Sequence, residues 1–175
     1  MVLLQRGKRD FTRWFLRVNS RLGAASARRR PAPTRNGFVM QRDKIVVTLH
    51  LVWTTRDRLP LIAPEWERAL HDCLGAVAVK HGCRVIAING MEDHVHLLLA
   101  PPPTVSISFL VQQLKGVSSH FVNTHTPCEG AFKWRGSFAA FSVSRWDVAK
   151  IATYIRRQKE HHAAGSIVAC GEPDD

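Results

Sequence analysis

The amino-acid sequence predicts an α+β domain of the ferredoxin-like (RRM-like) type, with elements in the order βαββαβ and one further helix at the C-terminal end. Three observations predict this fold. Four short segments are rich in β-branched and aliphatic residues, two longer segments between them repeat apolar residues every three or four positions, and a third helical segment follows the last strand. In such a fold two helices cover one face of a four-stranded sheet, and the other face is left for the final helix.

The first predicted β–α unit lies between residues 45 and 80. Its strand covers residues 45–55, where apolar side chains occupy every odd position up to Trp53. Its helix covers residues 64–80. Pro64 suits the first turn of a helix, where a missing N–H group does no harm, and His81-Gly82 is typical of a helix end.

The next two strands form a predicted hairpin. Residues 83–89 are the outgoing strand, and Asn89-Gly90 begins the turn, because this dipeptide is a strong hairpin signal. Residues 94–100 are the returning strand, which ends before three consecutive prolines. Since side chains alternate along a strand, its odd-numbered aliphatic residues face the helices and its two histidines face the free side of the sheet.

The remaining elements complete the pattern. A helix with a buried apolar stripe is expected over residues 104–125, and a loop over residues 126–136 follows it. The fourth strand is expected over residues 138–144 and the appended helix over residues 146–162.

The basic charge of the chain lies mostly in its first 39 residues. They hold ten Lys and Arg residues and one acid, and so contribute +9 of the net charge of +11. We expect residues 1–39 to be a disordered extension or an over-long start; a targeting leader and a DNA-binding arm are the alternatives. Residues 40–165 are then the domain, and residues 166–175 a frayed tail.

Composition favours a globular protein of the cytoplasm. The hydrophobic share of 45% is ordinary, and no apolar run reaches the roughly 18 residues of a membrane span. The four cysteines form no C-x-x-C pair and no finger-like spacing, so we expect reduced thiols that mostly fill the core.

One set of residues points to a metal beside a nucleophile. His94 and His96 share a strand face, while Tyr154, the only tyrosine, shares a helix face with Gln158. Two imidazoles and an amide oxygen leave open positions on Mg²⁺ or Mn²⁺ for phosphate oxygens. A phenol beside such a site suits phosphodiester chemistry.

Each of these residues also has a plainer interpretation. Histidine pairs are common on strands, a lone tyrosine on a helix is usually a core or rim residue, and Gln158 would most often be solvated. His50 is expected on the same free face as the pair. His161 and His162 extend the tyrosine helix, either as groups that support the ligands or as cations at a helix C-terminus.

Four further residues are candidates for DNA contact. Trp134 and Arg135 could stack on and clamp an unpaired base, although an anchoring role in the loop suits Trp134 as well. Lys115 and Arg157 could contact phosphates or simply be solvated. Asp93, just before the histidine pair, is interpreted as a turn residue rather than a ligand.

These motifs resemble a known family. Met-Glu-Asp-His-Val-His-Leu-Leu-Leu at residues 91–99 resembles the histidine–hydrophobic–histidine signature of HUH endonucleases, in the version of the single-tyrosine transposases of small bacterial insertion sequences. Residues 138–144, Tyr154-Ile155 and residues 158–162 resemble the branch that contains REP-associated tyrosine transposases. The likeness covers roughly residues 43–162. The loop at residues 135–138 departs from it, because that branch has more glycine and tyrosine there.

The resemblance implies a fold, an activity and partners. His94, His96 and Gln158 would hold Mg²⁺ or Mn²⁺, and Tyr154 would attack a phosphate of single-stranded DNA, which leaves a 5′-phosphotyrosine and a free 3′-OH. No nucleotide cofactor is implied. The family acts as a homodimer, often with each tyrosine helix serving the partner's histidines, and it recognises hairpins near element ends.

Two other functions stay open from the sequence. One is an RRM-like nucleic-acid-binding domain without catalysis, although such a domain usually has aromatic residues on its free face, where this chain has histidines. The other is a metal-dependent phosphoesterase in which water, not tyrosine, attacks.

Overall fold

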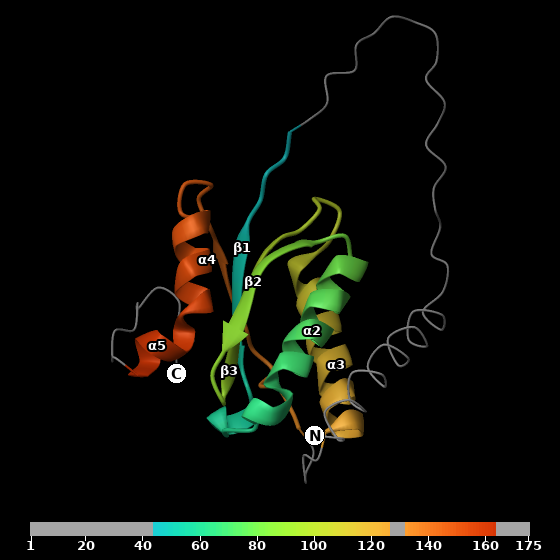
Figure 1. Ribbon diagram of the computed structural model, residues 1–175. Coiled ribbons are helices and arrows are strands. Elements are labelled where there is room, and N and C mark those ends of the chain that lie inside the picture. Colours follow the sequence, from blue (N-terminus) through green and yellow to red (C-terminus); the bar gives the residue numbers. More distant parts are fainter. Residues whose placement is uncertain (1–43, 127–131, 164–175) are drawn as a thin grey trace, which may run out of the picture. The chain divides into compact units, whose positions relative to one another are not determined.

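The computed structural model describes residues 44–126 and 132–163 (Figure 1). The predicted extension at residues 1–39 and the predicted tail at residues 166–175 lie outside these ranges, as do Cys128 and Cys170. The unit described below begins at Ile45.

Four antiparallel strands form one sheet in the order β2-β3-β1-β4. The strands are β1 (Leu49–Thr54), β2 (Arg84–Gly90), β3 (His94–Ala100) and β4 (Ala139–Ser142). The helices of the described ranges are α2 (Pro64–Lys80), α3 (Ile107–His125), α4 (Val148–Arg156) and α5 (Gln158–Ala163), with a short 3-10 helix η1 (Arg56–Arg58). This order and topology confirm the predicted ferredoxin-like fold with its appended helical segment.

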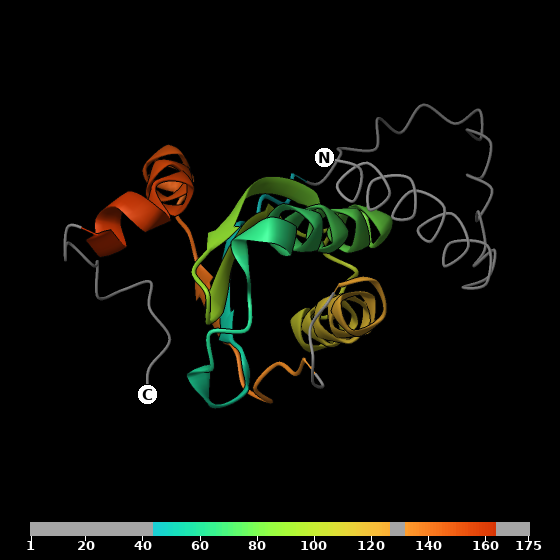
Figure 2. The ribbon, with the colours of Figure 1, turned by 60° about the horizontal axis from the view of Figure 1, so that its bottom comes forward.

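The sheet lies between two helical layers. Helices α2 and α3 cover one face, and α4 with α5 lies on the opposite face (Figures 1 and 2). The layer formed by α4 and α5 therefore lies on the sheet face where the sequence analysis places the two histidines.

None of the helices in the described ranges is long and apolar enough to cross a membrane.

Strand β3 is buried on both faces. Leu98 belongs to a cluster that includes Ala152 and Ile155 of α4, so it faces that helix. Val95, Leu97 and Leu99 alternate with it and face α2 and α3; all three are fully buried. Strand β3 therefore supplies apolar side chains to both layers, and the expected direction of its odd-numbered residues is confirmed.

Strand β1 begins later than its apolar pattern predicts. The alternating pattern starts at Ile45, but pairing starts at Leu49, which lies opposite Leu99 of β3 and Ser142 of β4. Ile45 and Val46 are exposed, because no strand lies beside them in the described ranges. A strand needs a partner as well as a suitable composition.

The predicted turn at Asn89-Gly90 is wrong by about two residues. Both residues belong to strand β2, and residues 91–93 make the connection to β3. Gly90 lies so close to the returning strand that an added Cβ atom would overlap the carbonyl oxygen of His94. Glycine is therefore present because two strands approach closely, and not because a turn needs a positive φ.

The last predicted helix is two helices. Helix α4 begins at Val148, two residues after the predicted start, because a turn at residues 144–147 precedes it. The helix ends at Arg156, and α5 begins at Gln158 after a break at Arg157. The predicted second helix also starts later, at Ile107, and the predicted fourth strand is shortened to β4.

The two cysteines within the described ranges match the expectation of reduced core thiols. Cys73 and Cys83 are buried and free. Burial raises the pKa of the Cys73 thiol to about 12, so this thiol stays protonated at neutral pH.

Two glycine substitutions test the close approach at Gly90. Gly90→Ala should lower the free energy of unfolding by about 1–3 kcal/mol, because the backbone must shift to admit a methyl group. Gly116→Ala is the matched control: it lies in α3 with open space around it and should raise stability by about 0.5–1 kcal/mol. Urea denaturation measures both. Equal stability of Gly90→Ala and the unaltered protein would contradict the role of Gly90.

Candidate functional site

His94 and His96 lie next to each other on the face of the sheet that α4 and α5 cover. Their ring centroids are 4.9 Å apart, and their exposed fractions are 2% and 0%. Strand alternation places both rings on the same side of β3 as Leu98. The predicted pairing of the two imidazoles is present, and both rings are buried.

Each ring uses its Nδ1 atom in a hydrogen bond. Nδ1 of His94 donates to Oδ1 of Asp93 at 2.7 Å. Nδ1 of His96 lies 3.0 Å from Nε2 of His50. In both rings Nε2 is therefore the atom suited to bind a metal, in the tautomer that carries its proton on Nδ1.

Charges and burial suit these roles. The hydrogen bond from His94 holds the pKa of the Asp93 carboxyl below its ordinary value, and the carboxylate also lies 3.7 Å from Arg58. Burial, and then the nearby rings of His94, His50 and His162, lowers the pKa of His96 well below its usual value. The His96 ring is therefore neutral at pH 7, which is the form that binds metals.

Tyr154 approaches the histidines within one chain. Its ring centroid lies 6.5 Å from that of His96, at an interplanar angle of 88°. The ring packs in the small apolar cluster formed by α4, β2 and β3, beside Ala87 and Leu98. This packing fixes the phenol against the sheet of its own chain.

Gln158 reaches the same place from the start of α5. Its side chain is fully buried, and its Nε2 atom donates to Nε2 of His162 at 2.9 Å. The ring of His162 in turn lies 5.4 Å from that of His94. The predicted set of His94, His96, Tyr154 and Gln158 is therefore brought together, with His50 and His162 around it.

Asn89 holds the break between α4 and α5. Its Nδ2 atom donates to the carbonyl oxygens of Ile155 at 2.9 Å and Arg156 at 3.1 Å, which lie at the end of α4. Carbonyls at a helix end have no partner within the helix, so a side chain that binds them can fix where the helix stops. Asn89 also lies opposite His96 in the sheet, so it links the helix break to the histidine strand.

A β-bulge supplies a second link to α4. Strand β2 shifts register against β3 between Val85 and Ala87, which leaves Ile86 as the extra residue. Nη2 of Arg156 donates to the carbonyl oxygen of Ile86 at 3.2 Å. The irregular part of the edge strand therefore helps to dock the tyrosine helix.

Polar groups bury the site on the side of α5. The ring of His161 stacks on Tyr154 with centroids 4.9 Å apart, and His162 lies beside His94. The histidines are thus enclosed by imidazole, amide, carboxylate and phenol groups and not only by apolar side chains. His50, His161 and His162 all lie beside the predicted site residues, and their supporting role stays a prediction.

The chemistry of the predicted donor set suits a hard divalent metal. Among the described residues, no three His, Cys, Asp or Glu side chains form a group able to hold a metal ion. The third donor of the predicted set is instead an amide oxygen. The three donor atoms, Nε2 of His94, Nε2 of His96 and Oε1 of Gln158, are all buried. Two imidazoles and one amide oxygen are compatible with Mg²⁺ or Mn²⁺.

Lys115 and Trp134 anchor a loop. Nζ of Lys115 donates to the carbonyl oxygens of Arg135 at 2.8 Å and Ser137 at 2.6 Å. Nε1 of Trp134 donates to Oγ of Ser118 at 2.9 Å, and its ring lies edge-on to Trp53. The anchoring role considered for Trp134 is the one its contacts support, and Lys115 ties the same loop to α3.

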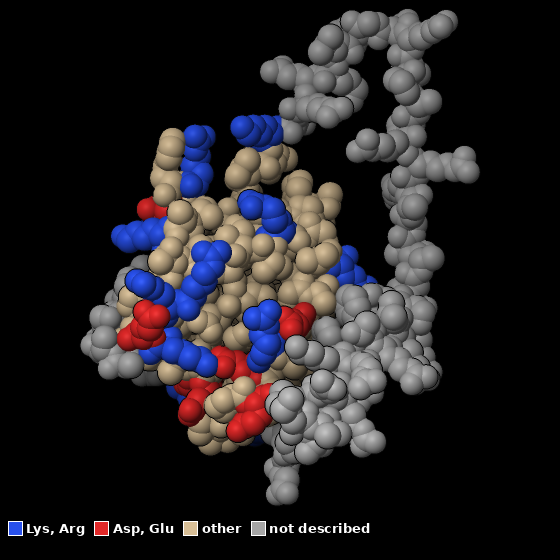
Figure 3. Space-filling view, viewed as in Figure 1, with Lys and Arg blue, Asp and Glu red and all other residues tan. Residues whose placement is uncertain are grey.

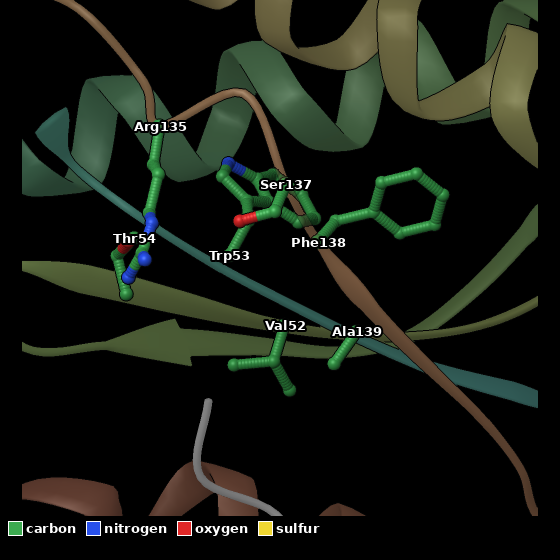
Figure 4. Close-up of a pocket in the computed structure, with 7 residues that line it drawn as sticks. All are labelled: Val52, Trp53, Thr54, Arg135, Ser137, Phe138 and Ala139. Atoms are coloured by element: carbon green, nitrogen blue, oxygen red, sulfur yellow. The ribbon is translucent and has the colours of Figure 1, made fainter. Parts of the chain in front are cut away.

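Arg135 and Arg157 lie at the surface. Arg135 lines a pocket of about 200 Å³ beside β1. Figure 4 shows its side chain reaching toward Thr54, whereas the ring of Phe138 points away from both residues. Arg157 forms an ion pair with Glu160 at 3.4 Å. Both side chains are exposed, so the predicted contacts with DNA stay predictions.

The fold, the paired histidines and the tyrosine helix define a protein of the HUH single-tyrosine class. The family model described as "Transposase IS200 like" matches residues 44–158, and the chain belongs to this family. The ISDra2 transposase TnpA of Deinococcus radiodurans is 33% identical over 129 residues, which are 71% of this chain and 89% of that protein. The transposase for insertion sequence element IS200 of Salmonella typhimurium is 26% identical over 71% of this chain and 84% of its own length.

Solved structures agree with this assignment. A candidate transposase from Deinococcus radiodurans R1 is 30% identical with a TM-score of 0.51, and the match covers 73% of this chain and 98% of that one. A REP-associated tyrosine transposase bound to a REP hairpin has a TM-score of 0.53 at 15% identity, over 73% of this chain and 74% of that one. The second match shows a shared fold. Together the comparisons confirm the family and the fold class that the sequence predicts.

Replacement of Asn89 tests its hold on the helix break. Asn89→Ala should lower the free energy of unfolding by about 1–3 kcal/mol and reduce hydrogen-exchange protection in residues 148–163, because two carbonyls lose their donor. Asn123→Ala is a matched control, since Asn123 also makes two hydrogen bonds to backbone, both at Phe132. It should leave protection of residues 148–163 unchanged. Full protection there in Asn89→Ala would refute the role of Asn89.

Proposed function

We propose that this transposase cleaves and rejoins single-stranded DNA through a 5′-phosphotyrosine at Tyr154, with a divalent metal held by His94, His96 and Gln158. The proximity of the Tyr154 and His96 rings, 6.5 Å apart within one chain, carries the proposal. The transposase names of the relatives support it, and so does the REP hairpin bound to a protein of the same fold.

The proposed cleavage and rejoining consume no cofactor. The phenolic oxygen of Tyr154 attacks the phosphorus, a bond from tyrosine to the phosphate forms, and the bond from phosphorus to the 3′ oxygen breaks. The phenol loses its proton, and the departing oxygen takes one up and becomes a 3′-OH. Attack by another 3′-OH on the phosphotyrosine restores the tyrosine and joins a new strand.

The residues around the phenol have separate tasks. Free phenols ionise near pH 10, roughly, so an attacking tyrosine needs help at neutral pH. A bound Mg²⁺ or Mn²⁺ would polarise a phosphate oxygen and stabilise developing charge. Asp93 and His50 orient the two imidazoles through their Nδ1 atoms. His161, stacked on Tyr154, fixes the orientation of the phenol ring.

The non-catalytic RRM-like alternative is disfavoured by what covers the sheet. An RRM binds RNA on an exposed sheet face with stacking aromatics. Here α4 packs on the corresponding face, with Ala152 and Ile155 against Ala87 and Leu98. The face is therefore used to place Tyr154 and not to stack bases.

The assembly is a separate part of the proposal. The resemblance implies a homodimer that exchanges tyrosine helices, whereas α4 lies against β2 and β3 of its own chain. We propose that each chain holds a complete donor set and nucleophile, whether or not two chains associate on a pair of DNA ends.

Replacement of Tyr154 tests the nucleophile. Tyr154→Phe should abolish the covalent adduct with a single-stranded hairpin oligonucleotide and leave hairpin binding unchanged, because the ring keeps its packing and loses only the oxygen. The assay is sharp because the chain has one tyrosine, so a phosphotyrosine can form at one position only. Denaturing gels detect the adduct. Its persistence in Tyr154→Phe would exclude Tyr154, and cleavage without any adduct would favour attack by water.

Replacement of the metal-site residues tests the metal. Asp93→Ala should raise the Mn²⁺ concentration needed for half-maximal adduct formation about 10–100-fold, because His94 loses the partner of its Nδ1 atom. Gln158→Ala should weaken metal use as well, while Gln158→Glu keeps an oxygen donor and should retain activity. Undiminished adduct formation with a chelator present would contradict the metal site.

A further inference from the structure

The turn between β4 and α4 displays a tryptophan in solvent. Trp146 is 78% exposed, the largest exposed fraction among the large hydrophobic side chains of the described ranges. The guanidinium of Arg145 lies 4.1 Å from the centroid of the indole ring. An indole stacked with a guanidinium is a planar, cationic surface, and both groups are used by proteins to stack on nucleobases.

The turn that carries this surface is an ordered one. The backbone N–H of Asp147 donates to the carbonyl oxygen of Ser144 at 2.9 Å, and that of Trp146 donates to Oγ of Ser144 at 3.3 Å. These two hydrogen bonds form a turn just before α4 begins at Val148. The backbone of the turn is therefore fixed by hydrogen bonds, and the indole that it carries is 78% exposed.

The surroundings favour an anionic partner. Arg145 and Lys150 are exposed beside the turn, Arg156 is exposed farther along α4, and Asp147 is the acid that opposes them. Figure 3 shows Lys and Arg side chains spread along the side of the molecule that holds α4. A polyanion carrying aromatic groups matches both the charge and the indole, and single-stranded DNA is such a ligand.

The position of the turn relative to Tyr154 gives the surface a role. Trp146 precedes Tyr154 by eight residues, most of them in α4, which corresponds to about 12 Å along a helix axis. A DNA strand whose phosphate lies at Tyr154 could therefore place a nucleotide a few positions away on the indole.

We propose that Arg145 and Trp146 form a stacking platform for one unpaired nucleobase of the DNA strand that flanks the cleaved phosphate. The role of the platform in cleavage rests on the proposed function, but binding by the platform does not. Neither residue belongs to the metal site or to the nucleophile.

Binding to a 20-nucleotide oligo(dT) tests the platform, measured by fluorescence anisotropy with the full chain in the Tyr154→Phe background, so that no cleavage is involved. Trp146→Ala should weaken binding about tenfold, which is the loss of one stacked base. Trp146→Phe should restore most of the affinity, since it keeps an aromatic face. Val79→Ala, an exposed apolar residue on α2, is the matched control and should change nothing.

Four further measurements decide the interpretation: the melting temperature of Trp146→Ala, its binding to a duplex, its oligomeric mass, and adduct formation by the unaltered chain. The melting temperature of Trp146→Ala should be unchanged, and binding to a blunt 20-base-pair duplex should be unaffected, because its bases are not free to stack. Equal oligo(dT) affinity in Trp146→Ala would overturn the proposal, and so would an equal loss on the duplex or a changed oligomeric mass. Weakened oligo(dT) binding together with no phosphotyrosine adduct in the unaltered chain would keep the platform and reject the proposed cleavage.

Discussion

The two-residue alternation of strand β3 is the constraint on which the rest of the structure depends. A strand buried on both faces must send one set of side chains to each layer, and here one layer receives only aliphatic groups while the other receives two imidazoles and a leucine. A slip of one residue would bury both histidines among α2 and α3. The close approach at Gly90 and the bond from the N–H of Thr55 to the carbonyl oxygen of Asp93 help to hold the register.

The tyrosine helix depends on the edge strand beside β3. Strand β2 has a bulge at Ile86 where it meets α4. The carbonyl oxygen of Ile86 and the side chain of Asn89 both form hydrogen bonds with residues at the end of that helix. Because Asn89 is paired with His96, the position at which the helix breaks is tied to the position of the imidazoles. Tyr154 precedes the break and Gln158 follows it, so one backbone irregularity places both side chains on the same side of the sheet.

Much of this arrangement could be predicted because it follows from local periodicity. Alternation in β3 correctly paired His94 with His96. Tyr154 and Gln158 also reach one place, but not on one helix face as predicted, because α4 ends between them. The bulge at Ile86 could not be predicted, since it lies in the pairing of β2 with β3 and not in a local pattern of the sequence. The break at Arg157 could not be predicted either, since the end of α4 is bound by Ile86 and Asn89, about 70 residues earlier in the chain. The role of Asp93 was missed although it adjoins His94, because turn chemistry and hydrogen bonding to a ring draw on the same residue type.

Trp146 lies in the turn just before α4, and Tyr154 lies near the C-terminal end of that helix. If the proposed platform and nucleophile act on one DNA strand, the spacing between the stacked base and the attacked phosphorus is set by α4 and the turn before it, and not by where the helix docks. If α4 packed on a neighbouring chain, the indole of Trp146 and the phenol of Tyr154 would both move to that chain. In the proposed reaction, the number of nucleotides between the stacked base and the cleaved phosphate would then be the same in a single chain and in a pair of chains that exchange α4.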